Sequence, residues 1–178
     1  ITAAGYGYIL VEYAGYSDDP LQPTHDRIKQ DVANVIDYLE QASFGSVSLI
    51  GESIGTGVAS YHAELAPPEK LLLITPYTDL VAVAQHHYWF YPATLLVDNA
   101  YDTTANLASY SGPVTIIHGT EDKVIPFALG AELATSLTNA TLIAIEGADH
   151  NNLFAYPETF AALSAWLATD KPTTHVND

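Results

Sequence analysis

The stretch "SLIGESIGTGVAS", Ser48–Ser60, joins an apolar, strand-like run to a helix-like run through a serine that lies between two glycines. Gly51 and Gly55 lie two residues either side of Ser53, which gives the pattern G-x-S-x-G. This pattern is typical of a sharp strand-to-helix turn, in which side chains at the two glycine positions would clash. Such a turn presents the serine hydroxyl at a helix N-terminus, where backbone N–H groups can stabilise an oxyanion. We therefore predict that Ser53 is a nucleophile and that the Ile54 N–H is an oxyanion-hole donor; the alternative is a small-residue packing turn.

Two further residues come after Ser53 in the order that a Ser-Asp-His triad requires on this kind of turn. Asp122 lies in "HGTEDKVIP", directly after an apolar strand-like run. His150 lies in "EGADHNNLF", directly after the next such run. Loops at the carboxyl ends of parallel strands meet at one edge of the sheet. We therefore predict that Asp122 and His150 reach Ser53, although a loop histidine without such partners would usually be only solvated.

The acidic member of the triad has competitors, and the sequence ranks them without excluding them. Asp149 is adjacent to His150 and would have difficulty reaching its Nδ1 atom. Glu121 is next to Asp122, and Asp98 lies in an irregular, aromatic segment. Asp122 is the best candidate, and a solvated turn is the alternative interpretation of "TEDK".

Apolar periodicity along the chain predicts alternating strands and helices. The expected strands are 8–13, 46–50, 70–75, 113–119 and 140–147. The expected helices are 24–41, with Thr24 as N-cap, then 54–65, 91–97, 127–137 and 157–168. This alternation favours an α/β fold with a mostly parallel sheet and helices on both faces. The short, continuous apolar strands agree with a sheet that is covered on both sides.

Composition excludes several classes of function. The 178 residues favour one domain. They carry 21 acidic residues against 5 Lys and Arg, a formal net charge of −16, so we expect no nucleic-acid partner. Cysteine is absent, which excludes disulfides and thiolate metal sites. His86 and His87 are adjacent and would not face one metal on a helix, so we expect no metal and no cofactor.

Five motifs together resemble the α/β-hydrolase superfamily, and more finely the small-lid serine hydrolases related to the yeast Bem46 protein. They are "VEYAGYSDD", "GESIGTG", "TPYTDL", "IIHGTEDKVIP" and "GADHNNL". The resemblance implies an α/β-hydrolase fold, a Ser53–Asp122–His150 triad, and hydrolysis of an ester or related acyl bond in a small-molecule substrate. A peptidase or thioesterase would use the same triad, and a non-catalytic binding domain could share the scaffold.

The chain also departs from this family. Members normally carry further strands and a His-Gly oxyanion loop before the first of these motifs, so the resemblance implies an N-terminally truncated domain over residues 1–178. We then expect an unpaired sheet edge that pairs with a missing N-terminal segment or with another chain. His118-Gly119 comes after the nucleophile, and we expect it to pack at a strand end. Residues 77–112 would form a short lid whose aromatic side chains pack on the body or line an acyl-binding wall.

Overall fold

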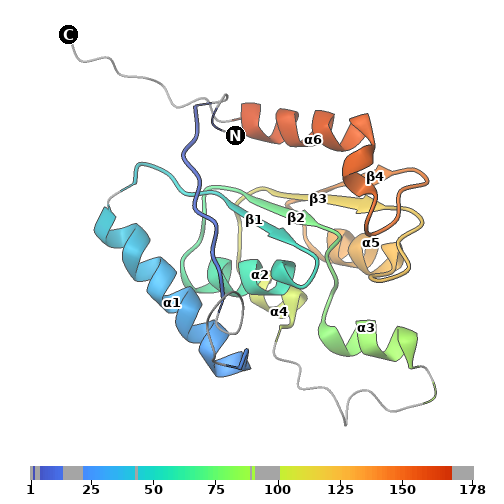
Figure 1. Ribbon diagram of the computed structural model, residues 1–178, viewed down its shortest axis with the longest axis horizontal. Coiled ribbons are helices and arrows are strands. Elements are labelled where there is room, and N and C mark those ends of the chain that lie inside the picture. The colour runs from blue at the N-terminus through green and yellow to red at the C-terminus, as the bar shows by residue number, and fades with distance from the viewer. Residues whose placement is uncertain are drawn as a thin grey trace.

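The computed structural model describes residues 2, 5–13, 22–42, 44–88, 90 and 101–169. A four-stranded parallel sheet forms its centre (Figure 1). Its strands are β1 (Leu49–Glu52), β2 (Leu71–Ile74), β3 (Val114–Gly119) and β4 (Ala140–Ile145), and they lie in the order β1-β2-β3-β4. The four strands correspond to four of the five that the sequence predicts, and the prediction of a parallel α/β sheet is confirmed.

Helices connect the strands and cover the sheet. They are α1 (His25–Ala42), α2 (Gly55–Leu65), α3 (Leu80–His87), α4 (Thr103–Leu107), α5 (Phe127–Ser136) and α6 (Pro157–Ala168), with a short 3₁₀ turn η3 (Leu153–Ala155) before α6. The sequence predicts α1, α2, α5 and α6 to within about two residues at each end, as hydrophobic periodicity allows. Within the described residues no helix is both long and apolar enough to cross a bilayer.

Side chains that alternate along the central strands pack into two cores on opposite faces of the sheet. On one face Leu71 and Leu73 pack with residues of α2, α4 and α5. On the other face Leu72 and Ile74 pack with Trp166 and its neighbours on α6. All four residues of β2 are buried, so helices cover both faces, as predicted.

Helix α1 packs on α2 through one apolar face, because its apolar residues recur at helical spacing. Ile28, Val32 and Ile36 face α2, where they join a cluster that includes Val58. The Thr24 carbonyl accepts a hydrogen bond from the Ile28 N–H at 3.0 Å, at the N-terminal end of the helix. The Arg27 N–H donates to Thr24 Oγ1 at 3.4 Å, so Thr24 caps the helix one residue before its first residue, as the sequence predicts.

The strand predicted at 8–13 is wrong: these residues are described, but they belong to no strand. The segment crosses the molecule in an extended form and passes over β1 in the view of Figure 1. Its ends are held by side chains, since the Tyr6 hydroxyl donates to the Leu167 carbonyl at 2.8 Å and Tyr13 packs against the α1–α2 cluster. Between these ends Leu10 is 85% exposed. The apolar pattern alone does not produce a strand, because a strand also needs a hydrogen-bonded neighbour, and no described strand pairs with this segment.

Periodicity does not predict helices α3 and α4, because each is too short for its apolar pattern to repeat. Each one starts at an aspartate N-cap: Asp79 accepts from the Ala82 N–H at 2.8 Å, and Asp102 accepts from the Ala105 N–H at 2.8 Å. The two caps also form an isolated antiparallel bridge with each other. The helix predicted at 91–97 lies outside the described residues, and the lid over 77–112 stays a prediction.

Candidate active site

Ser53 comes directly after β1 and adopts a left-handed backbone conformation with φ of 52°. Its N–H donates to the Ile74 carbonyl at 2.9 Å, which fixes the turn against β2. A Cβ atom at Gly51 would lie 2.8 Å from both the Gly55 carbonyl oxygen and the Ala59 Cβ, so this position requires glycine. A Cβ at Gly55 would meet nothing within 4 Å, so the expectation that both glycines prevent a clash is wrong for Gly55.

The structure brings together the three side chains that the sequence selects. Ser53 Oγ lies 2.9 Å from His150 Nε2. On the other side of the imidazole, His150 Nδ1 lies 2.7 Å from Asp122 Oδ2. Ser53 comes from the turn after β1, Asp122 from the loop after β3, and His150 from the loop after β4. All three therefore lie at the carboxyl edge of the sheet, where parallel α/β folds build their sites.

The Asp122 side chain is fully buried, and hydrogen bonds from backbone N–H groups and histidine side chains surround its carboxylate. Its Oδ1 accepts from the N–H groups of Val124 and Ile125, each at 2.9 Å. Burial alone raises the pKa of this carboxyl, but the side chains of His118 and His150 and the two N–H groups outweigh it and lower the pKa to about 2. Asp122 is therefore an anion throughout the neutral and mildly acidic range.

Backbone contacts hold the Asp122 loop and the His150 loop together. The Glu121 N–H donates to the Ala148 carbonyl at 2.9 Å, and the Gly147 N–H donates to Thr120 Oγ1 at 2.9 Å. Gly119 allows this approach, because a Cβ there would lie 2.3 Å from the Ala148 carbonyl oxygen. The positions of the carboxylate and the imidazole are thus fixed relative to each other.

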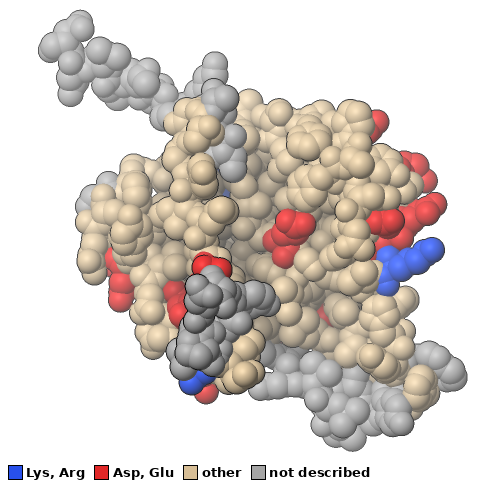
Figure 2. Space-filling view, viewed as in Figure 1, with Lys and Arg blue, Asp and Glu red and all other residues tan. Residues whose placement is uncertain are grey.

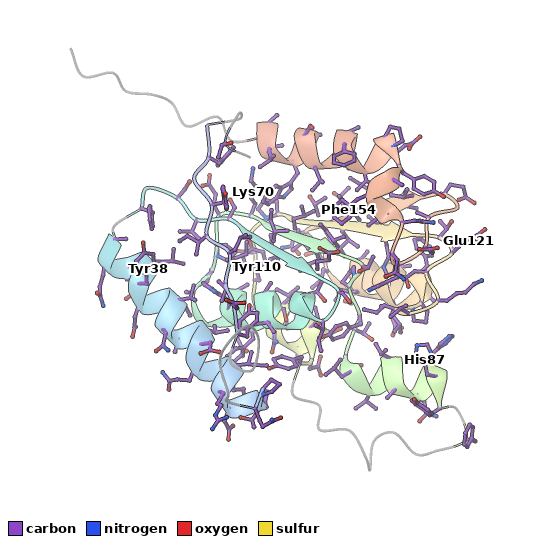
Figure 3. The ribbon with its side chains drawn as sticks, in the orientation of Figure 1. Tyr38, Lys70, His87, Tyr110, Glu121 and Phe154 are labelled. Atoms are coloured by element: carbon purple, nitrogen blue, oxygen red, sulfur yellow. The ribbon has the colours of Figure 1, made fainter. Side chains whose placement is uncertain are left out.

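The competing acids occupy other places. Asp149 Oδ1 accepts from the Asn151 N–H at 2.8 Å and the Asn152 N–H at 3.0 Å, so its carboxylate closes its own loop. Glu121 is exposed and points away from the molecule at the edge of the sheet (Figure 3). Asp98 lies outside the described residues.

Ile54, the expected oxyanion-hole donor, is the N-cap residue of α2, directly after Ser53. Within the described part of the chain its N–H has no hydrogen-bond partner, so it can receive an acceptor. Its carbonyl accepts from the Tyr77 hydroxyl at 3.2 Å, and Tyr77 is fully buried. Burial raises the pKa of Tyr77, which keeps the phenol protonated as a donor. Sequence reasoning missed this role of Tyr77, although the residue lies in "TPYTDL", one of the motifs that carry the family resemblance.

Helix α3 reaches the loop that carries Asp122 through its last residue. His87, labelled in Figure 3 at the end of this helix, lies with its Nε2 2.8 Å from the Val124 carbonyl oxygen. Figure 2 shows acidic side chains on the visible face with only isolated Lys and Arg. Among the described residues, no group of three or more His, Asp or Glu side chains could hold a metal ion.

Known proteins resemble this chain in sequence. No protein-family model matches it. An uncharacterised protein of Mycobacterium tuberculosis is 29% identical over 152 residues, which cover 83% of this chain and 54% of that protein. Lysophosphatidylserine lipase ABHD12 of Xenopus tropicalis is 28% identical over 152 residues, which cover 75% of this chain and 39% of the lipase. The chain thus spans about half the length, or less, of these curated relatives.

Solved structures resemble it in fold. An esterase from Exiguobacterium antarcticum has a TM-score of 0.64 at 16% identity, covering 88% of this chain and 79% of the esterase. An α/β hydrolase from a Mar Chica lagoon metagenome has a TM-score of 0.60 at 20% identity, covering 78% of this chain and 68% of that chain. The fold is therefore the α/β-hydrolase fold. The resemblance to the α/β-hydrolase superfamily that the motifs indicate is confirmed, while the finer resemblance to the Bem46-related group stays a prediction.

Proposed function

We propose that this chain carries the catalytic residues of a serine hydrolase that cleaves a carboxylic ester or a related acyl bond. The observation that carries the proposal is the hydrogen-bonded series from Ser53 Oγ through His150 to Asp122, with distances of 2.9 Å and 2.7 Å. A serine hydroxyl is a weak nucleophile unless a base lies within hydrogen-bond reach and a third group orients that base. The relatives with hydrolase, esterase and lipase names support the same class of reaction.

In the proposed reaction, Ser53 Oγ attacks the acyl carbon while its proton passes to His150 Nε2. The carbonyl oxygen becomes an oxyanion, and the Ile54 N–H donates to it. His150 then gives the proton to the leaving group as the carbon–heteroatom bond breaks, which leaves an acyl-enzyme. Water attacks this ester by the same steps, with His150 again as base, and releases the acid and free Ser53. Asp122 holds the imidazole with its Nδ1–H toward the carboxylate throughout.

Apolar side chains beside the site support a substrate with an apolar acyl group. Ile54 is adjacent to Ser53 and is 58% exposed, and Val124 lies two residues after Asp122 and is 47% exposed. The contact between His87 and the Val124 carbonyl brings the end of α3, followed by the exposed Tyr88, close to Val124. Exposed apolar groups around a polar reaction centre are typical of a binding site.

A fluorophosphonate probe tests the proposal directly, because it modifies an activated serine in the folded protein. We expect one adduct, located by peptide mass spectrometry at Ser53, together with turnover of p-nitrophenyl esters. Ser53→Ala should lose both while its circular-dichroism spectrum stays unchanged. A wild-type protein that is folded but neither labelled nor active would contradict the hydrolase and favour a non-catalytic binding domain.

We also propose that a further strand pairs with the outer edge of β1. The Leu49 and Ser53 N–H groups point to β2, so the backbone groups of the alternate residues Ile50 and Glu52 point the other way. No described strand lies on that side. The strand would come from another segment or another chain, and its loop could supply a second oxyanion donor. Slow amide hydrogen exchange at Ile50 and Glu52 in solution is the expected result, and fast exchange at both would contradict it.

A further inference from the structure

A second buried histidine lies against Asp122, at the same carboxylate oxygen that faces His150. His118, on β3, is 0% exposed, and its Nε2 lies 3.4 Å from Asp122 Oδ2. The same nitrogen lies 2.9 Å from the Ile125 carbonyl oxygen. The sequence predicts only that His118 packs at a strand end, and packing alone does not require a polar ring in this position.

The hydrogen bonds of His118 fix its tautomer. A carbonyl oxygen can only accept, so the Nε2 atom that bonds to Ile125 must carry the proton. That N–H is shared between the carbonyl and the nearby carboxylate oxygen. The other ring nitrogen, Nδ1, is buried and has no partner among the described residues. It faces Gly130 of α5, where a Cβ atom would lie only 2.2 Å from Nδ1.

His118 and Asp122 are also joined through Ile125. The Ile125 carbonyl accepts from His118 Nε2, and the Ile125 N–H donates to Asp122 Oδ1 at 2.9 Å. The His118 imidazole thus positions the carboxylate in two ways. It binds Ile125, which donates to the carboxylate, and it also contacts the carboxylate directly. Phe127 fixes the ring from another side, with the two rings edge-to-face at 5.6 Å.

From this geometry we propose that His118 is a positioning residue, which directs the Asp122 carboxylate toward His150 and limits how strongly that carboxylate attracts the imidazole proton. The inference rests on the proposed triad chemistry. Two titratable groups face Asp122: His118 from β3 and His150 from the loop after β4. His87 of α3 contacts the same loop at the Val124 carbonyl. Its sequence neighbours Glu121 and Lys123 are exposed.

Substitution of His118 separates this role from packing. His118→Leu keeps a buried side chain of similar size but removes the donor, whereas His118→Gln keeps an N–H donor near the Nε2 position. Without the donor the Asp122 carboxylate is more basic and attracts the His150 proton more strongly. We therefore expect the acidic limb of the kcat/KM profile of His118→Leu to move to higher pH. Loss of an outer group that orients a functional side chain typically costs about 10- to 100-fold in activity, and His118→Gln should recover most of it.

Gly130→Ala is a second variant, in case His118→Leu does not fold. It retains the imidazole but pushes it away from Gly130. Alanine is otherwise more favourable than glycine inside a helix. A loss of activity in this variant would therefore result from displacement of His118. Displacement of the ring changes the distances from Nε2 to the Ile125 carbonyl and to Asp122, so we expect the acidic limb to move. His62→Leu is the matched control, because His62 is a buried histidine on α2. Among the described residues, no hydrogen bond or ion pair joins His62 to Asp122. The acidic limb of the His62→Leu profile should therefore not move.

A proton NMR measurement distinguishes failure of this inference from failure of the proposed function. The His150 Nδ1 proton, held between nitrogen and carboxylate, should give a downfield signal that moves in His118→Leu and not in His118→Gln. If the wild-type protein is inactive but this signal behaves as expected, the hydrolase proposal fails and the positioning role stands. If His118→Leu and His118→Gln lose activity equally with an unmoved acidic limb, or if His118→Leu equals wild type, His118 only packs and the inference is wrong.

Discussion

Strand β2 and residues 8–13 have similar apolar sequences, "LLLI" and "YILVEY", yet only β2 is a strand. β2 pairs with β1 on one side and β3 on the other, and helices cover both of its faces. No described strand pairs with residues 8–13, and their side chains are largely exposed. Apolar composition thus selects residues that can form a strand, and the neighbouring strands decide whether they do.

The two regions also differ in how firmly the chain is held at their ends. The strands of the sheet end in loops that bring Ser53, Asp122 and His150 together, and these loops are held by backbone hydrogen bonds. The segment 5–13 is held by a few side-chain contacts near its ends. We therefore expect substitutions in the sheet region to have large effects and matched substitutions in the segment to have small ones.

The largest difference should come from replacing a carboxylate by an amide in each region. Asp122→Asn should lower kcat by about 10⁴, because an amide cannot hold the His150 imidazole in the orientation and charge state that the reaction needs. Glu12→Gln makes the same chemical change in the exposed segment and should leave kcat within a few-fold of wild type. Steady-state kinetics on a p-nitrophenyl ester measure both. Similar losses in the two variants would mean that the segment takes part in the reaction.

A leucine-to-alanine pair compares the packing of the two regions. Leu72 of β2 is 0% exposed, and truncation of such a residue typically costs about 2–5 kcal/mol in the free energy of unfolding. Leu10 is 85% exposed, so Leu10→Ala should change it by no more than about 0.5 kcal/mol. Urea denaturation followed by tryptophan fluorescence gives both values. A loss at Leu10 as large as that at Leu72 would show that the segment is buried in solution, as a paired sheet edge would require.

The smallest effect concerns pH and the buried histidine of α2. Burial lowers the pKa of His62 below its usual value of 6.5. The unfolded chain therefore binds more protons here than the folded protein at pH below about 6.5, so His62 makes stability fall as the pH falls through this window. His62→Gln should flatten the dependence of the melting temperature on pH between about 7 and 5. An identical slope in wild type and His62→Gln would show that His62 is not desolvated.

Much of the site could be predicted because it depends on local pattern and on topology. The glycine pattern around Ser53 fixes a turn, and the strand-end positions of Asp122 and His150 result from a parallel sheet. Tyr77 and the hydrogen bonds of His118 could not be predicted, because their partners lie far away in sequence or are backbone carbonyls. The strand expected at 8–13 failed for a related reason, since a strand needs a neighbour that the local sequence does not name.

The backbone of Ser53 has a consequence for how such a protein changes over evolution. A left-handed conformation with φ of 52° costs an L-residue other than glycine roughly 1–2 kcal/mol. Glycine would adopt the same conformation without this cost but would bring no hydroxyl. Selection for a more robust fold alone would therefore replace the one side chain on which the proposed chemistry depends. On the proposed chemistry, serine at this position marks a place where selection for activity outweighs selection for stability.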